Sequence, residues 1–439
     1  MSETTEVMSL KEKLLADFTI RKTALLLENQ VLRGFREKSA EAFAKLGFPG
    51  KKHEEYRYIN FTSILSPEYS YSFSPSTSEI PSNVLENSLV LNDAFRVVLV
   101  NGHFSENASQ LTGLTNGVVV ESLASAIRRN DVHALSHLGT LANNEADAFI
   151  ALNSALFVDG LFVYLPKGVQ LEKPLQIIQV STGDALQITM PRILLVAEPD
   201  SNAQIVHTQL SLASTSASFS NTVAEVLVEQ NAFVQWTTLQ AEEISASHVN
   251  TLEAHVKKGG NFSTVTISLG GQTLRNNLQI ALDEAACEAH LYGYYHPTAG
   301  QTFDQHTLVD HRFPKCESNE LYKGVIDADG TAVFNGKVYV RKDAQKTNAY
   351  QSNKNILLSE QATVNTKPQL EIYADDVKCS HGSSTGVLDP EQLFYLRSRG
   401  ISVEKARALL LSAYAGEVLE KIPHEALRDA LAAALAERI

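Results

Sequence analysis

Cysteine is scarce in this chain, whose 439 residues include only Cys287, Cys316 and Cys379. An odd number of widely separated cysteines predicts no disulfide framework and fits a reducing compartment. The N-terminal residues also lack a basic segment followed by an apolar one, and no apolar run approaches the ~18 residues of a membrane span. These absences predict a soluble, cytoplasmic protein that does not enter a membrane.

An excess of positive charge is missing as well. The chain has 37 Lys and Arg against 50 Asp and Glu, which gives a formal charge of −13. Nucleic acids and anionic membrane surfaces are bound mainly through basic residues, so the composition argues against both classes of partner and favours proteins or metal-bearing partners. The phosphate-binding motif G-x-x-x-x-G-K-[ST] is also absent, so any ATP used would bind to another subunit.

Helical patterns occur at the two ends of the sequence. In the N-terminal region, residues 1–160, Ser9 and Glu12 form a capping box and the first fifty residues predict a helical hairpin. A Ser-, Pro- and Tyr-rich irregular arm follows at 66–88, then short strands at 95–100 and 117–120 and helical spacing over 122–157. In the C-terminal region, residues 387–439, helices are predicted to start after Asp389, Ser402 and His424. These short helices have more apolar surface than they can bury together, so one face should pack on the rest of the chain or bind a partner.

The central region, residues 161–386, consists of short β-branched and aromatic runs separated by polar turns. One unit recurs, in which an apolar run and four turn-forming residues are followed by another apolar run. Its copies end at Ala232, Gly260, Ala286, Gly330 and Ala362, which are 26 to 44 residues apart. Repeats of this length that are nearly all strand predict a parallel β-helix, with a β-sandwich as the alternative. The longest interval predicts an inserted loop or an extra half-coil.

Cys379 and His381 are the most compact pair of metal-ligand residues in the sequence. If residues 377–381 are extended, both side chains lie on one face, roughly 6.6 Å apart. Thiolate and imidazole suit Fe(II), Zn or an iron–sulfur cluster. A cluster usually has four protein ligands, so we hypothesise that a second chain completes the site. The alternative is a buried cysteine and a hydrogen-bonded histidine in a turn.

Other residues of interest give weaker patterns. Cys287 is predicted to lie in the core, whereas Cys316 reads as an exposed thiol that is either incidental or part of an interface. A further group, with spacings that match no metal signature, is predicted to be solvated or hydrogen-bonded; it comprises His290, His296, His306, His311, Asp304 and Asp310.

Two short motifs mimic enzymatic or ion-binding sites. Gly382 to Gly386 matches G-x-S-x-G with Ser384 as nucleophile, but that motif requires a strand before it and a helix directly after it. His381 is also too close in sequence to Ser384 for the usual base. Asp327-Ala-Asp329-Gly330 lacks the further ligands of a calcium loop and predicts a β-turn.

Seven blocks of the sequence resemble the SufB/SufD family of the SUF iron–sulfur cluster assembly machinery. They are Phe149-Ile-Ala-Leu-Asn153, Phe157-Val-Asp-Gly160, Arg275-Asn-Asn-Leu278, Ser318-Asn-Glu-Leu-Tyr-Lys-Gly324, Gln351-Ser-Asn-Lys-Asn355, Pro368-Gln-Leu-Glu-Ile-Tyr373 and Lys378-Cys-Ser-His-Gly382. The resemblance implies a right-handed parallel β-helix with helical N- and C-terminal regions. It also implies a SufB-like homologue that pairs through the β-helix and a SufC-like ATPase that docks on residues 387–439.

The last block resembles the SufD-type members of the family. This implies a scaffold and iron-recruiting subunit without enzymatic turnover or a permanent cofactor, with Cys379 and His381 as transient ligands of iron or a cluster at a subunit interface. The alternatives are a SufB-like cluster scaffold, an adaptor that only holds an ATPase, and a carbohydrate-acting β-helix enzyme using carboxylates such as Glu371, Asp375 and Asp376. Self-association of the isolated chain is left open.

Overall fold

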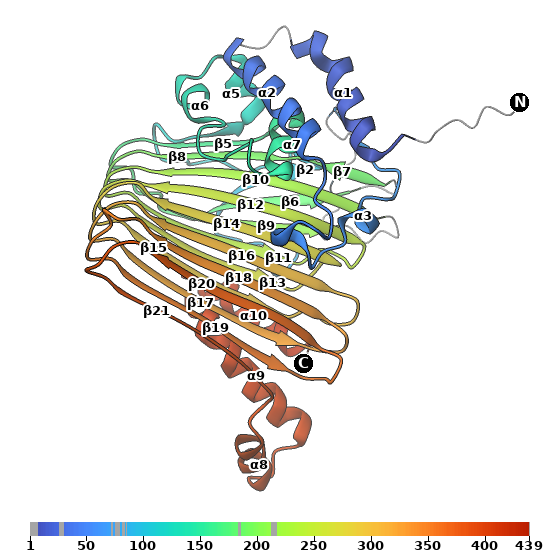
Figure 1. Cartoon of the computed structure of the whole chain (residues 1–439), viewed down its shortest axis with the longest axis vertical. Helices are drawn as coiled ribbons and strands as arrows, with labels where there is room; N and C mark the ends of the chain where they lie inside the picture. Colours follow the sequence, from blue (N-terminus) through green and yellow to red (C-terminus); the bar gives the residue numbers. More distant parts are fainter. Residues whose placement is uncertain are drawn as a thin grey trace, which may run out of the picture.

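Two long sheets that face each other form the body of the molecule (Figure 1). The computed structural model describes residues 8–25, 30–71, 73–74, 80, 84, 86–182, 186–211 and 217–438. Part of the predicted arm at 66–88, namely residues 72, 75–79, 81–83 and 85, lies outside these residues. The first sheet contains β1 (Ser70–Tyr71), β4 (Val119–Ser122), β5 (Gly160–Leu165), β7 (Gln187–Thr189), β8 (Arg192–Ala197), β10 (Ser218–Val228), β12 (Ala246–Val256), β14 (Thr273–Leu282), β16 (Thr302–His311), β18 (Thr331–Val340) and β20 (Thr363–Ile372). The second contains β2 (Phe95–Val100), β3 (His103–Phe104), β6 (Leu175–Ser181), β9 (Asn202–Ser211), β11 (Phe233–Gln240), β13 (Asn261–Ser268), β15 (Glu288–Tyr295), β17 (Glu317–Ile326), β19 (Asn348–Leu357) and β21 (Lys378–Gly386).

From β8 onward the chain alternates between the sheets, so each pair of strands makes one coil of a solenoid. Each strand pairs in parallel with the strand two positions later, in an unbroken register such as Thr273↔Thr302 and Thr302↔Thr331. β2 pairs in parallel with β6, and β4 pairs antiparallel with β5, so both sheets continue into residues before 160. The predicted parallel β-helix with helical ends is confirmed.

One corner of the solenoid repeats the same backbone turn in successive coils. The turn residue has a left-handed conformation, with φ between 55° and 66°, at Asp200, Asn231, Gly259, Ala286, Lys315 and Lys346. Its N–H donates to a carbonyl in the next coil, for example from Ala286 to Pro314 at 3.2 Å and from Lys315 to Gln345 at 2.9 Å. This ladder fixes the coil length, because each turn is hydrogen-bonded to the one after it.

The corner also explains the long interval in the repeat. Ala286 lies at this corner, whereas Gly330 lies at the opposite one, in the turn between β17 and β18. The residue that occupies the same corner position as Ala286 in the next coil is Lys315. The repeat pattern did not include the turn at Lys315, because this turn does not end in Gly or Ala. The interval therefore holds an extra half-coil and no inserted loop.

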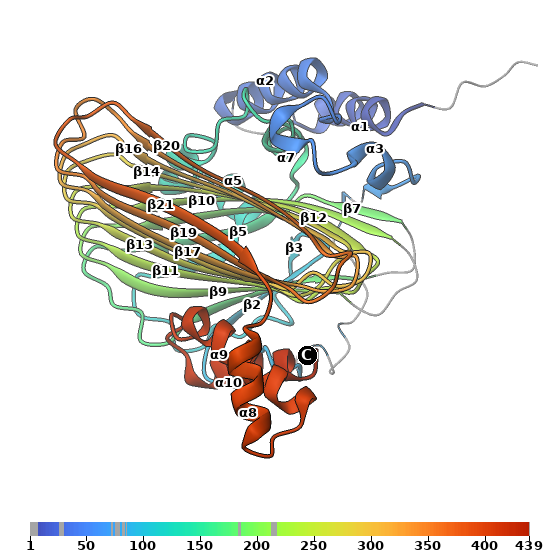
Figure 2. The ribbon, with the colours of Figure 1, turned by 60° about the horizontal axis from the view of Figure 1, so that its bottom comes forward.

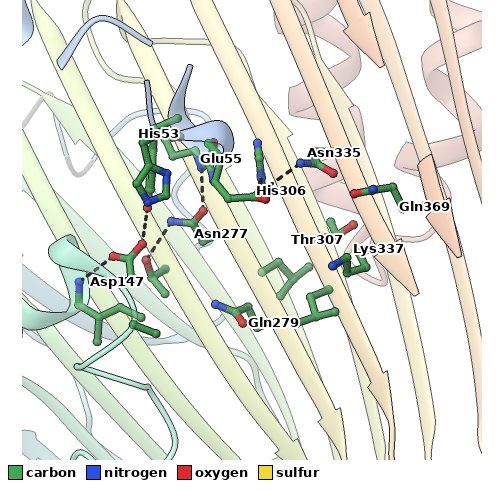
Figure 3. A pocket seen from close by; sticks show the side chains of 17 residues that line it. His53, Glu55, Asp147, Asn277, Gln279, His306, Thr307, Asn335, Lys337 and Gln369 are labelled. Carbon is green, nitrogen blue, oxygen red and sulfur yellow. Dashed lines mark hydrogen bonds and ion pairs between the residues drawn. The ribbon is translucent and has the colours of Figure 1, made fainter. Parts of the chain in front are cut away.

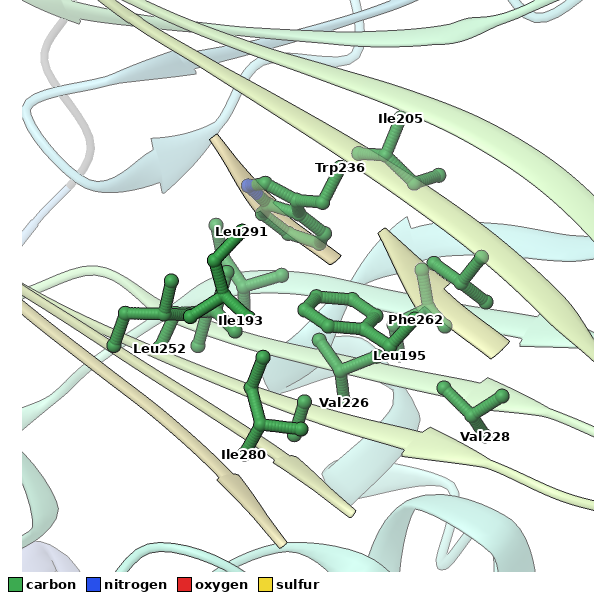
Figure 4. Packing of buried hydrophobic residues seen from close by; sticks show 14 of the residues in the cluster. Ile193, Leu195, Ile205, Val226, Val228, Trp236, Leu252, Phe262, Ile280 and Leu291 are labelled. Carbon is green, nitrogen blue, oxygen red and sulfur yellow. The ribbon is translucent and has the colours of Figure 1, made fainter. Parts of the chain in front are cut away.

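The interior of the solenoid has an apolar half and a polar half. In the apolar half Trp236 and Phe262, from the second sheet, pack among aliphatic side chains of the first, such as Ile193 and Leu252 (Figure 4). In the polar half buried amides pair across the interior; Gln240 and Asn276 exchange hydrogen bonds of 3.0 and 2.8 Å. Such pairing is what allows polar groups to be buried without a large desolvation cost.

The N-terminal helices cover part of the outer face of the first sheet (Figures 1 and 2). They are α1 (Leu10–Leu25), α2 (Gln30–Leu46), η1 (Glu54–Tyr56), α3 (Phe61–Ile64), α5 (Leu123–Arg128), α6 (Val132–His137) and α7 (Ala148–Leu156). The predicted hairpin and capping box are present, since the backbone N–H of Ser9 donates to Glu12 at 2.8 Å. A fully buried ion pair, Arg192–Glu225 at 2.6 Å, anchors this layer because Glu225 also accepts from the backbone N–H groups of residues 139, 141 and 142.

Of the three C-terminal helices, two lie against the outer face of the second sheet, whereas the first packs on the second helix (Figure 2). The three are α8 (Pro390–Ser398), α9 (Val403–Leu419) and α10 (Glu425–Ala436), and their caps fall at Asp389, Ser402 and His424 as predicted. Leu411 and Leu431 are buried against the sheet, and Lys323 of β17 donates to the Tyr414 carbonyl at 2.9 Å. None of the helices described is long and apolar enough to cross a membrane.

Candidate functional site

The solenoid ends in two strands whose outer edges have no partner among the residues described. β20 pairs only with β18 and β21 only with β19, so their far edges present free N–H and C=O groups. The strands are ten and nine residues long, and every residue of both is half-buried or exposed. Pro368 lies within β20, a position tolerated at sheet edges because proline cannot donate to a ladder. Long open edges of this kind are templates for pairing with another chain.

Cys379 and His381 lie on this terminal edge strand, on one face of β21 as their spacing predicts. Their register partners are Ala349 and Gln351 of β19, whose side chains are buried in the interior. The side chains of Cys379 and His381 therefore point to the inner side of the last coil, at the open end of the solenoid. Cys379 is half-buried against a small apolar cluster that includes Val338, and burial raises the pKa of its thiol. His381 is exposed. Within the described part of the chain, no three His, Cys, Asp or Glu side chains gather into a metal site.

A buried polar stack lies beneath His381. Glu320, Gln351 and His381 are successive register partners on β17, β19 and β21. Gln351 Nε2 donates to Glu320 Oε2 at 2.7 Å, Thr307 Oγ1 donates to Glu320 Oε1 at 2.6 Å, and burial raises the pKa of Glu320 to about 7. The amide oxygen of Gln351 is buried and accepts no hydrogen bond. Sequence reasoning missed this stack, because the repeat pattern predicted stacked coils but not the register between them.

Cys316 contradicts the prediction of an exposed thiol. It is fully buried, as is Cys287, which was predicted to lie in the core. The cause is the corner ladder, in which the residue after each left-handed residue turns into the interior. Both cysteines hold that position, one coil apart.

The four histidines do not converge, as their irregular spacing predicted. His290 contacts Glu288 at 3.3 Å and His311 contacts Ser318 at 2.9 Å, whereas His306 contacts Glu55 and Asp304. His296 differs because it is fully buried and neither ring nitrogen has a hydrogen-bond partner; burial lowers its pKa to about 4.

A cavity of ≈ 270 Å³, lined by both polar and apolar side chains, lies between the N-terminal layer and the outer face of the first sheet (Figure 3). Glu55 of η1 and Asp147, the N-cap of α7, face His306 and Asn277 across it. The carboxylates are already engaged: Asp147 accepts from Tyr56 and from two N–H groups of α7, and Glu55 binds His306 at 3.3 Å. These contacts hold the N-terminal helices on the solenoid. The proximity of His306 and Asp304 is therefore explained by ion pairing and needs no metal.

The two mimicking motifs have structural roles. Ser384 lies inside β21 and no helix follows it directly, so the nucleophile turn is absent. Residues 327–330 form the predicted turn, in which the Gly330 N–H donates to the Asp327 carbonyl at 2.9 Å. Glu371, a carboxylate considered for sugar chemistry, is paired with Lys337 at 2.6 Å.

A second exposed surface lies on α8. No residue of this helix is buried, and Phe394 and Tyr395 are 72% and 56% exposed. The helix projects beyond the solenoid, whereas α10 is packed against the sheet (Figures 1 and 2). Large exposed aromatic side chains that adjoin one another are typical of protein-binding surfaces.

Comparison with known proteins gives a consistent result along most of the chain. Residues 178–414 match the family model described as "SUF system FeS cluster assembly, SufBD core domain", and residues 8–177 match "SufBD protein N-terminal region". An iron–sulfur cluster assembly SufBD family protein of Synechocystis is 29% identical over 97% of this chain and 93% of its own length. The chloroplastic protein ABCI7 of Arabidopsis thaliana is 30% identical over 91% and 84%, and the iron–sulfur cluster assembly protein SufD of Escherichia coli is 28% identical over 90% of both chains.

Proposed function

Because the chain belongs to the SufBD family of SUF iron–sulfur cluster assembly proteins, we propose that it is a non-enzymatic scaffold subunit of a cytoplasmic assembly complex. Its partners in this proposal are a SufB-like homologue and a SufC-like ATPase. Iron, or a nascent cluster, is the cargo and is held only transiently. The observation that carries the proposal is the placement of Cys379 and His381 on the unpaired terminal strand of the solenoid.

The open end supports pairing with a homologous β-helix. A second solenoid that ends in similar strands would satisfy the free backbone groups of β20 and β21 and cover Tyr373, which is 57% exposed. If the homologue is missing, two copies of this chain could use the same edges. The edge therefore supports pairing in general, and the composition of the purified complex decides between the two partners.

The ligand pair supports a site completed by that partner. Cys379 and His381 supply one sulfur and one imidazole, which is two ligands fewer than a cluster usually takes. The unpaired amide oxygen of Gln351, the register partner of His381, is a ready acceptor for one ring N–H. Such a hydrogen bond would fix the tautomer of His381 and leave the other nitrogen free for a metal.

The surface of α8 supports the ATPase contact. Most of the apolar surface of α10 and of the second half of α9 is buried on the second sheet, so it is not free for a partner. The exposed residues gather on α8 and the first half of α9, including Phe394, Tyr395 and Leu409. We therefore narrow the docking surface from residues 387–439 to this part of it.

The test is cluster assembly in a strain whose own copy of this gene is replaced by His381→Ala or Cys379→Ser. We expect lower cluster yield on a reporter iron–sulfur protein, with a complex that still copurifies. Ser383→Ala is the matched control, because Ser383 lies on the same strand and face and is exposed. Unchanged yield with an intact complex would remove the ligand role. Copurification of an ATPase without a homologous β-helix would favour the simple adaptor instead.

A further inference from the structure

Two cysteines that are distant in sequence meet at one corner of the solenoid. Cys287 follows the left-handed residue Ala286, and Cys316 follows Lys315 one coil later. The coils are joined next to the cysteines by a hydrogen bond of 2.9 Å from the Glu317 N–H to the Cys287 carbonyl. In-register neighbours on adjacent parallel strands have Cα atoms about 4.8 Å apart, within the ~4.4–6.8 Å range that a disulfide spans.

The two sulfur atoms share their surroundings. Cys287 Sγ lies 3.1 Å and Cys316 Sγ 3.2 Å from the same carbonyl oxygen, that of Glu284. Both thiols donate to this one carbonyl, so the two sulfurs meet at a shared acceptor. Both are free thiols. This arrangement brings two reactive groups together that the proposed cluster site does not use.

We propose that Cys287 and Cys316 form a redox-active dithiol that closes reversibly to a disulfide between two adjacent coils. The oxidant is hydrogen peroxide. The Cys316 thiolate attacks one peroxide oxygen, which gives a sulfenic acid and releases the other oxygen as water after protonation. The Cys287 thiol then attacks that sulfur, the S–S bond forms, and the sulfenic oxygen leaves as a second water.

The local environment favours Cys316 as the attacking group. The neighbouring Cys287 thiol, together with the backbone N–H groups of Cys287 and Ala286, lowers the pKa of Cys316. The neighbouring Cys316 and burial raise the pKa of the Cys287 thiol, so Cys287 is the group that keeps its proton until the second step.

Access is through the turns that cover the corner. Both side chains are buried, but the covering residues Glu284, Ala286 and Lys315 are exposed, so only the turn itself separates the sulfurs from solvent. Oxidation is therefore expected to be slower than at the half-exposed Cys379. It should still occur in the folded protein.

The experiment uses the full chain with Cys379→Ser, which leaves only the two corner thiols. The protein is treated with hydrogen peroxide, unfolded in an alkylating agent and digested without reduction for mass spectrometry. We expect both thiols to disappear together, a peptide pair linked through Cys287 and Cys316, and full recovery of both thiols with dithiothreitol. The proposal would be overturned if both thiols can still be alkylated at a peroxide dose that fully oxidises Cys379 in the unsubstituted chain. It would also be overturned if the only disulfides found join two different chains.

Two single variants test the order of the steps. With Cys287→Ser added, a dimedone-reactive sulfenic acid should accumulate on Cys316; with Cys316→Ser added, Cys287 should stay a thiol. Equal sulfenic acid formation in both variants would overturn the assignment of Cys316 as attacking group. Because the disulfide joins two coils, peroxide should raise the melting temperature of the Cys379→Ser chain by several degrees. The melting temperatures of the two chains that also carry Cys287→Ser or Cys316→Ser should not change.

Discussion

His381 lies one coil above Gln351: the two residues are register partners on β21 and β19, and Gln351 in turn donates to the buried Glu320 at 2.7 Å. The exposed candidate ligand therefore rests on a polar stack inside the solenoid. An ordinary apolar core would offer the imidazole no hydrogen-bond acceptor. Gln351 and Glu320 are buried polar residues that pair with each other through this hydrogen bond. The first prediction concerns Glu320.

Glu320→Gln should remove one component of the pH dependence of stability. Burial raises the folded-state pKa of Glu320 to about 7, whereas an unfolded chain gives Glu about 4.3. The folded state therefore binds more protons between these values, and stability falls as pH rises from about 4.3 to about 7. The difference between the folded and unfolded pKa values corresponds to a loss of about 3 to 4 kcal/mol in the free energy of unfolding over this pH range.

Urea unfolding from pH 4.5 to 8 measures this effect. The stability of wild type relative to Glu320→Gln should decrease across this range, because titrations of other groups cancel in the difference. In the variant, the side-chain amide of Gln351 can rotate by half a turn, so that its oxygen accepts a hydrogen bond from the amide N–H introduced at position 320. No buried group then loses its partner, and we expect the variant to fold. Parallel stability curves for the two proteins would contradict a raised pKa at Glu320.

Phe394→Ser should weaken binding of the SufC-like ATPase without unfolding the chain. Phe394 is 72% exposed, so its removal leaves no internal cavity, whereas loss of a central aromatic contact typically weakens binding about tenfold or more. The dissociation constant is measured by calorimetry or biolayer interferometry. Val132→Ser is the matched control, because Val132 is 69% exposed on α6, away from α8. Equal weakening by both variants would argue against a docking surface on α8.

Arg192→Met should destabilise the protein by about 3–5 kcal/mol. It leaves the buried carboxylate of Glu225 without its ion-pair partner, at a site where both side chains are 0% exposed. The free energy of unfolding is the measurement. Adding Glu225→Leu should recover only part of the loss, because the N–H groups of residues 139, 141 and 142 then lose their acceptor. Full recovery would show that this carboxylate is dispensable as a cap.

Substitutions at Ala286 should rank in stability as Gly, then Ala, then Val. Its φ of 60° is left-handed, which costs an L-residue roughly 1–2 kcal/mol and a β-branched residue more. Ala286→Gly relieves that cost but adds flexibility to the unfolded chain, so we expect a net gain below about 1 kcal/mol. Thermal unfolding of the three proteins gives the order. At Ala285, which has no positive φ, glycine should be destabilising; the same order at both positions would exclude backbone conformation as the cause.

The sequence by itself determined the local elements. The caps at Ser9, Asp389 and Ser402 lie where the helices begin, because a cap depends only on neighbouring residues. The strand-rich repeat predicted stacked coils for a similar reason, since side-chain alternation and turn composition are local properties. The two-residue spacing of Cys379 and His381 likewise sufficed to place them on one face of a strand.

The tertiary structure alone decided which distant residues meet. Cys316 is buried and not exposed because the corner ladder turns it inward, and no local pattern in Pro314-Lys315-Cys316 signals this. Glu320 and Gln351 stack beneath His381 only through the register between coils, whose length varies along the chain. A pattern reports a residue's nearest neighbours in sequence, whereas in a solenoid the nearest neighbours in space are about thirty residues away.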